Sequence, residues 1–250
     1  MLKAVLFDLG GTLIHYERPE VDFAAVGQEG LRGFYRTMQE AGLAPPPWDV
    51  FARAFHSRFA EAVRVSRETL QSGSTDQVLR EGLAGLGLTL PDGVWTACRA
   101  AYYAPVRAIV QPIEGAGEAL QALAALGLRL GLVSNTFWPG DLHDADLAAC
   151  GLLDLLPVRI YSSAAGYVKP HPEIYRLALA QVGARPEEAV FVGDRLREDV
   201  AGPQAIGLRA VLVEVPFREE RDARIVPEAR LSSLRELPAL IAAWLKGVSP

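Results

Sequence analysis

The chain has 250 residues, half of them hydrophobic, which suffices for one large domain or for a core domain with a smaller insertion. Its formal net charge of −5 gives no concentration of positive charge for nucleic acid or an anionic membrane surface, so neither is an expected partner. Two distant cysteines exclude a disulfide framework, and the lack of a signal peptide or a membrane-spanning run predicts a cytoplasmic protein.

The chain begins with a short apolar run at residues 4–7 that predicts a buried β-strand. Residues 16–107 carry almost no strand signal. Phe51, Phe55 and Phe59 recur there at helical spacing, and the three prolines at 45–47 interrupt the helical pattern. We therefore predict an α-helical cap domain over residues 16–107, inserted into a core formed by residues 1–15 and 108–250, and assign the aromatic stripe to the interior of the cap.

The rest of the chain alternates between helix and strand patterns. Apolar, β-branched runs at residues 128–133, 189–192 and 210–213 predict strands buried on both faces, and residues 158–162 predict a shorter one. Helical patterns occupy residues 117–126, 141–153, 171–183 and 198–206, and a final helix follows the capping box of Ser233 and Glu236. This alternation predicts an α/β fold, with a doubly wound, mainly parallel, Rossmann-like sheet.

Polar residues follow three of the predicted strands at the point where each strand ends. Asp8 follows the first strand, Ser134 and Asn135 follow the second, and Gly193 and Asp194 follow the run at residues 189–192. In an open parallel sheet the reactive groups gather outside the carboxyl ends of the strands. We therefore expect these residues to form one site.

Four short sequence segments in these regions resemble the motifs of a known family. They are FDLGGTL at residues 7–13, LVSN at 132–135, VKPHPEIY at 168–175 and VGDRLREDV at 192–200. In their order and spacing they resemble the motifs of the haloacid dehalogenase-like hydrolase superfamily, in a member whose helical cap follows the first motif. The resemblance covers nearly the whole chain.

The resemblance implies a magnesium-dependent phosphoryl transfer. Asp8 would be the nucleophile and form an aspartyl-phosphate intermediate with a small phosphorylated substrate. Asp8, Asp194, Asp199 and the backbone carbonyl of Gly10 would hold Mg²⁺, a hard ion that prefers oxygen ligands. Asp199 has an alternative role, because an acidic residue near the start of a helix is favoured electrostatically in any case.

Further residues would hold the phosphoryl oxygens. Ser134 would donate from its hydroxyl, and Lys169, one of only three lysines, would supply a compact positive charge. With Asp8, these two make up the predicted catalytic set. Gly11, Thr12 and Asn135 are predicted to add donors, since glycine lets the backbone approach a ligand closely.

The first motif departs from the pattern of the superfamily's phosphatases, which usually carry a second aspartate two residues after the nucleophile. Gly10 occupies that position. Three functions remain open: a phosphatase, a carbon–halogen hydrolase, or a phosphate- or metal-binding module with little turnover. Retention of Asp194 and Asp199 favours the phosphatase, because the dehalogenases that this chain resembles do not need a metal.

The sequence indicates less clearly which residues contact the substrate. Possible contacts are Arg53, His56, Arg58, Arg64 and Trp138. We interpret His143, between Asp141 and Asp144, as part of a solvated helix start. Either a monomer or a homodimer is compatible with the sequence.

Overall fold

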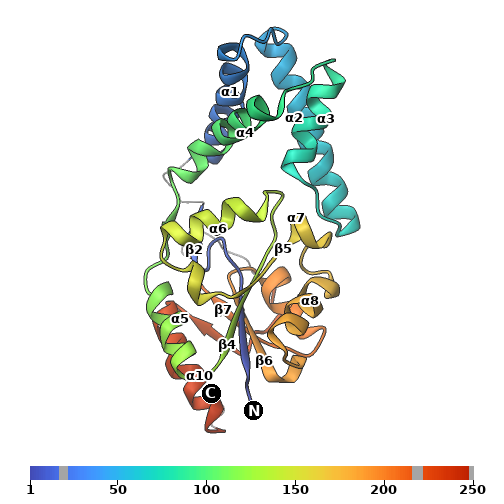
Figure 1. Cartoon of the computed structure of the whole chain (residues 1–250). Helices are drawn as coiled ribbons and strands as arrows, with labels where there is room; N and C mark the ends of the chain where they lie inside the picture. Colours follow the sequence, from blue (N-terminus) through green and yellow to red (C-terminus); the bar gives the residue numbers. More distant parts are fainter. Residues whose placement is uncertain (17–21, 216–221, 248–250) are drawn as a thin grey trace.

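The computed structural model describes residues 1–16, 22–215 and 222–247. Within these residues, six strands form one parallel sheet in the order β5-β4-β1-β6-β7-β8 (Figure 1). The strands are β1 (Ala4–Phe7), β4 (Arg129–Ser134), β5 (Val158–Tyr161), β6 (Ala189–Gly193), β7 (Arg209–Val213) and β8 (Ala229–Leu231). The predicted α/β class and the mainly parallel sheet are confirmed.

Helices cover both faces of the sheet, as alternating side chains of β1 show. Val5 and Phe7 pack on one side with α5 (Ala116–Ala125), α6 (Gly140–Ala149) and α10 (Leu237–Leu245). Ala4 and Leu6 pack on the other side against α8 (Pro172–Val182). Every residue of β1 is buried, which explains its continuously apolar sequence.

Short helical segments complete the connections between these elements. They are η1 (Leu153–Leu155), α7 (Ser162–Ala165), η2 (Pro186–Glu188), η3 (Leu196–Ala201), α9 (Gly202–Gln204) and η4 (Leu234–Glu236). The helix predicted at residues 198–206 is in fact the π-helical turn η3 followed by the single turn of α9. Such π-helical turns are frequent at functional sites.

Four helices lie between the short strands β2 (Ile14–His15) and β3 (Gln111–Pro112), which pair antiparallel. They are α1 (Phe23–Glu40), α2 (Trp48–Thr69), α3 (Thr75–Gly85) and α4 (Asp92–Arg107). Phe51 and Phe55 are buried among them, with ring centroids 4.5 Å apart, and Phe59 packs on the same cluster. The aromatic stripe is therefore the interior of this helical group, as predicted. We call α1–α4 the cap.

The cap rests on the carboxyl-terminal edge of the sheet (Figure 1). In the loop between α2 and α3, the backbone nitrogen of Thr75 donates to the carbonyl of Phe137 at 2.8 Å. Arg99 of α4 forms an ion pair with Asp141 of α6 at 2.9 Å. These contacts hold the cap over the loops that follow the strands.

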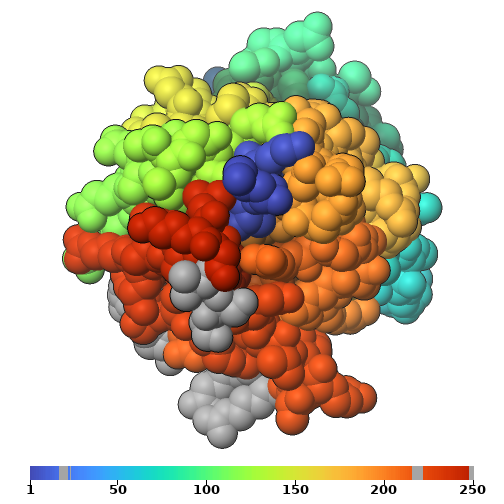
Figure 2. Space-filling model, turned by 90° about the horizontal axis from the view of Figure 1, so that it is seen from below, coloured from blue at the N-terminus to red at the C-terminus, as the bar shows by residue number. Residues whose placement is uncertain are grey.

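The opposite end of the sheet is far from the cap. Figure 2 looks onto this end and shows the first residues of the chain at the surface, with Met1 95% exposed. None of the helices in the described ranges has the length and apolarity needed to cross a bilayer.

Candidate active site

The strand order places the ends of β1, β4 and β6 side by side. β1 is hydrogen-bonded to β4 on one edge and to β6 on the other. The chain adds β4 and β5 on one side of β1 and then crosses back to add β6 on the other side, so the strand order reverses at β1. The residues that follow these strands therefore meet at one point, where ligands bind in open α/β sheets. Asp8, Ser134 and Asp194 come from the three strand ends.

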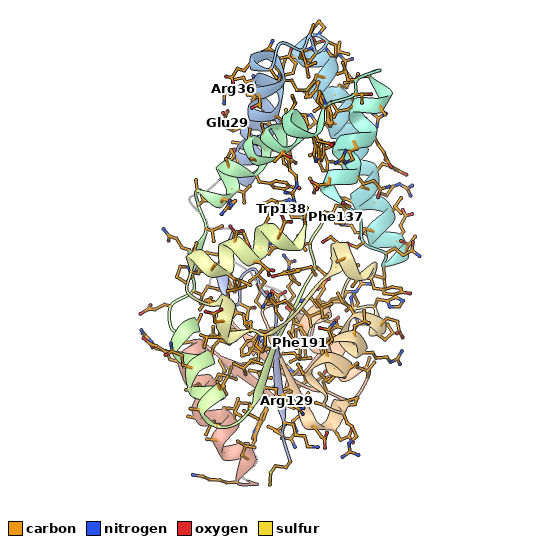
Figure 3. The ribbon with its side chains drawn as sticks, viewed as in Figure 1. Glu29, Arg36, Arg129, Phe137, Trp138 and Phe191 are labelled. Carbon is orange, nitrogen blue, oxygen red and sulfur yellow. The ribbon has the colours of Figure 1, made fainter. Side chains whose placement is uncertain are left out.

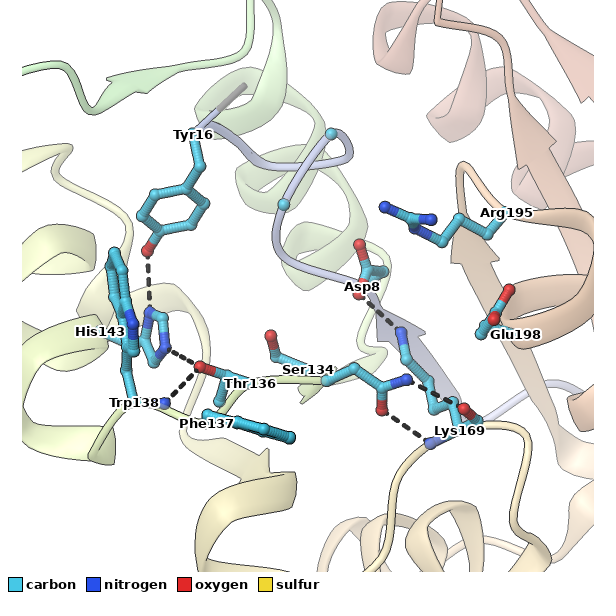
Figure 4. Close-up of a pocket in the computed structure, with 13 residues that line it drawn as sticks. Asp8, Tyr16, Ser134, Thr136, Phe137, Trp138, His143, Lys169, Arg195 and Glu198 are labelled. Atoms are coloured by element: carbon cyan, nitrogen blue, oxygen red, sulfur yellow. Dashed lines mark hydrogen bonds and ion pairs between the residues drawn. The ribbon is translucent and has the colours of Figure 1, made fainter. Parts of the chain in front are cut away.

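A cavity of about 340 Å³ opens there, among the loops that follow the strands (Figure 4). It is lined by Asp8, Gly10, Gly11, Tyr16, Ser134, Asn135, Thr136, Phe137, Trp138, His143, Lys169, Arg195 and Glu198. Six of the nine residues predicted for the site line this cavity. Asp194 and Asp199 are buried beside it, and Thr12 is fully buried.

Three carboxylates lie together at the base of this cavity. Asp8, Asp194 and Asp199 each offer an oxygen within 4.8 Å of the other two, and all three residues are buried. Carboxylates this close repel one another strongly away from water, so a cation is needed to balance them. An all-oxygen donor set of this kind fits Mg²⁺.

Lys169 supplies part of the balancing charge. Its Nζ donates to Asp8 Oδ1 at 2.6 Å and to Asp199 Oδ1 at 2.7 Å, and the side chain is almost completely buried. Burial opposes its positive charge, but Asp199 and Asp8 outweigh this effect and raise the pKa of Lys169. Burial raises the pKa of Asp199 despite its contact with Lys169. One ammonium does not neutralise three ionised carboxylates, so the cluster in its ionised form carries the negative charge that a divalent cation would balance.

The other oxygen of Asp199 closes the turn after β6. Oδ2 accepts hydrogen bonds from the backbone nitrogens of Asp194 at 3.1 Å and Arg195 at 2.9 Å. A Cβ on Gly193 would lie 2.3 Å from Cγ of Asp199, so only glycine fits there. Asp199 thus has a structural role in this turn, while its Oδ1 contacts Lys169 and its carboxylate belongs to the cluster. The sequence offered a different alternative, an electrostatic preference for an acidic residue near a helix start.

Ser134 and Asn135, at the end of β4, have different roles. The Ser134 hydroxyl faces the cavity and forms no hydrogen bond with any residue that the structure describes (Figure 4). Asn135 instead positions the lysine: Nδ2 donates to the carbonyl of Lys169 at 2.9 Å, and Oδ1 accepts from its backbone nitrogen at 2.6 Å. Asn135 lines the cavity, but its amide is already used in this pair.

The glycine loop after β1 also uses its own amides. The backbone nitrogen of Gly11 donates to Ile14 at 2.9 Å, and that of Thr12 donates to Leu9 at 3.3 Å. Both donors predicted for a phosphate therefore have acceptors within the loop. Gly10 and Gly11 form part of the cavity surface, whereas Thr12 does not.

Tyr16 occupies the space above Gly10. A Cβ at position 10 would lie 3.4 Å from Cδ2 of Tyr16. The Tyr16 hydroxyl donates to Asp146 Oδ2 at 3.1 Å and lies 2.9 Å from Nδ1 of His143. Asp146 also pairs with Arg107 at the end of α4. Both chain segments that lead into and out of the cap are thus tied to one carboxylate of α6.

The interpretation of His143 as a solvated residue is wrong. Its side chain is buried between the rings of Trp138 and Tyr161, and its Nε2 lies 2.7 Å from Thr136 Oγ1. Leu142, His143, Asp146 and Leu147 form the buried face of α6. This helical spacing was present in the sequence, but two of the four residues are polar, which hid the pattern.

The structure divides the substrate contacts that the sequence suggested. Trp138 lines the cavity, whereas Arg53, His56, Arg58 and Arg64 do not. Arg58 instead lines a second cavity between α2 and α3. Residues that the sequence analysis missed are Tyr16, Thr136, Phe137, His143, Arg195 and Glu198.

The burial of His143 predicts a pH-dependent stability. Burial lowers its pKa from 6.5 to about 4, against the opposing charges of Asp144 and Asp141. As the pH falls below 6.5, the unfolded chain binds the proton before the folded one, and the free energy of unfolding decreases. Between about pH 7 and about pH 5 this loss amounts to about 2 kcal/mol.

Chemical denaturation at the two pH values measures the loss. His143→Gln should remove it, whereas His56→Gln on the exposed face of α2 should leave it in place. An equal pH dependence in His143→Gln and the unsubstituted protein would contradict this assignment.

Comparisons with known proteins agree with this geometry. The family model described as "haloacid dehalogenase-like hydrolase" matches residues 2–207. A phosphoserine phosphatase of Thermus thermophilus is 30% identical, over 94% of this chain and 98% of its own. A glyceraldehyde 3-phosphate phosphatase of Methanopyrus kandleri is 28% identical, over 95% of this chain and 96% of its own.

Solved structures show the same fold. A 2-haloacid dehalogenase from Pseudomonas syringae superimposes with a TM-score of 0.69 at 24% identity, covering 98% of this chain and 100% of the other. A HAD phosphatase from Thermococcus onnurineus superimposes with a TM-score of 0.65 at 23% identity, covering all of both chains. With the family model spanning most of the sequence and the carboxylate cluster at the expected strand ends, the chain belongs to the haloacid dehalogenase-like hydrolases.

Proposed function

We propose that the protein is a Mg²⁺-dependent phosphatase that acts on a small phosphorylated metabolite through an aspartyl-phosphate intermediate. The observation that carries this proposal is the buried cluster of Asp8, Asp194 and Asp199 beside Lys169, at the base of a cavity. A dehalogenation site needs a nucleophile but no cation, and so gives no reason for three adjoining carboxylates. The phosphatase names of the two relatives described above support the same proposal.

Each residue of the cluster has a role in this reaction. Asp8 attacks phosphorus, and the bond to the leaving oxygen breaks; water then attacks the phosphoryl group and releases Asp8. The Ser134 hydroxyl and the Lys169 ammonium hold the phosphoryl oxygens as their charge changes. Bound Mg²⁺, held by Asp8, Asp194, Asp199 and the Gly10 carbonyl, would screen the charges of the phosphoryl group and the carboxylates.

A second candidate is a carbon–halogen hydrolase, which Gly10 favours because a halide leaves without a proton. A third is a binding module with little turnover. An assay of aryl phosphates, acetyl phosphate and 2-haloacids, each with and without Mg²⁺, separates the three. The phosphatase predicts phosphate release that stops on metal chelation. Halide release without metal would establish the dehalogenase. If no substrate gave a product, the binding module would be the remaining candidate.

Because Gly10 provides no acid, we expect the rate of hydrolysis to depend on whether the leaving group is an alkyl or an aryl alcohol. Gly10→Asp would add the acid that protonates a leaving alcohol, and is expected to raise hydrolysis of alkyl phosphates by about 10²-fold with little change for aryl phosphates. Tyr16 Cδ2 would lie 3.4 Å from the new Cβ, an ordinary van der Waals contact.

Gly10→Ala serves as the steric control, because it adds the same Cβ without an acid. Steady-state rates for matched alkyl and aryl phosphates give the comparison. Equal changes for both ester types in Gly10→Asp would contradict the proposed effect of the missing acid.

A further inference from the structure

The cavity has two chemically different sides. Figure 4 shows Arg195 and Glu198 on one side of Asp8, and Tyr16, His143 and Trp138 on the other. The charged side chains among the described lining residues are Asp8, Lys169, Arg195 and Glu198. The side formed by Tyr16, Thr136, Phe137, Trp138 and His143, which we call the aromatic wall, therefore presents no charged group to the cavity.

The hydroxyls of Tyr16 and Thr136 and both ring nitrogens of His143 are hydrogen-bonded within the aromatic wall or to Asp146 behind it. The Tyr16 hydroxyl donates to Asp146, so Nδ1 of His143 donates to Tyr16 and Nε2 accepts from Thr136. Thr136 Oγ1 accepts in turn from the backbone nitrogen of Trp138 at 2.9 Å. In this series of hydrogen bonds every donor has an acceptor within the protein, and His143 is neutral. The aromatic wall thus offers a carboxylate no cation, and the indole nitrogen of Trp138 is the one side-chain donor among its described residues for which no hydrogen bond is found.

The rings of the aromatic wall are held in place before any ligand binds. Trp138 stacks on His143 with centroids 5.7 Å apart and contacts Tyr103 of α4 edge-on at 5.3 Å. A Cβ on Gly73 would lie 2.9 Å from the ring of Phe137, so the loop between α2 and α3 packs closely on that ring. Figure 3 shows Phe137 and Trp138 between the cap and the sheet. A ligand that stacks on such fixed rings loses little of its binding energy to ordering them.

We infer that the aromatic wall selects a phosphate ester with a flat, uncharged leaving group, such as an aryl or arylmethyl alcohol, and that Trp138 and Phe137 determine this specificity. The inference rests on the proposed phosphatase function. A flat apolar group gains contact with the rings, whereas a carboxylate would lose its water without a charged partner. A leaving group that lies against this wall therefore differs in class from that of phosphoserine, which carries a carboxylate.

Three esters of primary alcohols test this inference while keeping the leaving oxygen similar. Benzyl phosphate should exceed ethyl phosphate in kcat/KM by about tenfold. Phosphoserine should fall below ethyl phosphate. Trp138→Ala should bring the ratio of benzyl to ethyl phosphate close to one, and Trp138→Phe should retain most of it. Circular dichroism of each variant verifies that its fold is intact.

Binding of benzylphosphonate and ethylphosphonate, measured by calorimetry with Mg²⁺, separates this inference from the proposed function. Tighter binding of benzylphosphonate, lost in Trp138→Ala, supports the aromatic wall even if no ester is hydrolysed, in which case the phosphatase proposal alone fails. Phosphate release with phosphoserine as the best of the three esters would overturn the inference and leave the phosphatase proposal standing. Equal binding of the two phosphonates would also overturn it.

Discussion

Asp8→Asn is expected to reduce phosphate release by about 10⁴-fold or more, because the amide cannot attack phosphorus. The fold should remain intact. Asp8 is one of three buried carboxylates within 4.8 Å of one another, so its neutralisation removes repulsion while Lys169 keeps its contact with Asp199. In the absence of metal, the free energy of unfolding should therefore be unchanged or higher.

The exposed residue Asp92, in the first turn of α4, provides a matched control. Asp92→Asn should retain full activity. Rates under saturating substrate and denaturation curves for both variants complete the comparison. A substantial residual rate in Asp8→Asn, with the same metal dependence as the unsubstituted protein, would show that another group attacks phosphorus.

Lys169→Met should affect both stability and catalysis. Removing the ammonium leaves the carboxylates of Asp8 and Asp199 buried without their cationic partner, a change that typically costs about 3–5 kcal/mol. Loss of a positive charge beside the phosphoryl oxygens should also lower kcat by roughly 10²- to 10³-fold. Since bound Mg²⁺ would balance the same carboxylates, saturating Mg²⁺ should restore part of the lost stability but not the rate.

Lys3→Met is the control for this substitution. Lys3 pairs with Glu188 at 2.7 Å, but its side chain is 52% exposed, so its loss should cost at most about 1 kcal/mol. Urea denaturation with and without Mg²⁺ measures both variants. Equal stability losses in the two variants would contradict the assignment of Lys169 as the counter-charge of the site.

The sheet was predictable because its strands carry a strong, simple signal. The strand predicted at residues 189–192 is observed as Ala189–Gly193, and the weaker run at 158–162 as Val158–Tyr161. Every residue of β6 is buried, as its continuous apolar run indicates, whereas in β5 only Ile160 and Tyr161 are buried. Strand β8 was missed because only three residues pair with β7, too few for a periodic pattern.

The chemical groups of the site were more predictable than their contacts. Asp8, Ser134 and Asp194 follow strands directly, and strand ends in a parallel sheet converge by geometry alone. The position of Tyr16 above Gly10 depends instead on how the chain folds back on itself between these two residues, and no local sequence pattern predicts this. The π-helical turn η3 was likewise missed. Asp199, within this turn, accepts hydrogen bonds from the backbone nitrogens of Asp194 and Arg195, which precede it.

The reacting carboxylate can be identified directly by acid quenching during turnover, followed by peptide mass spectrometry. The account predicts one phosphoryl group on the peptide that contains Asp8, present with Mg²⁺ and absent after chelation or in Asp8→Asn. Phosphorylation of a different residue, or rapid metal-dependent phosphate release by Asp8→Asn, would contradict it.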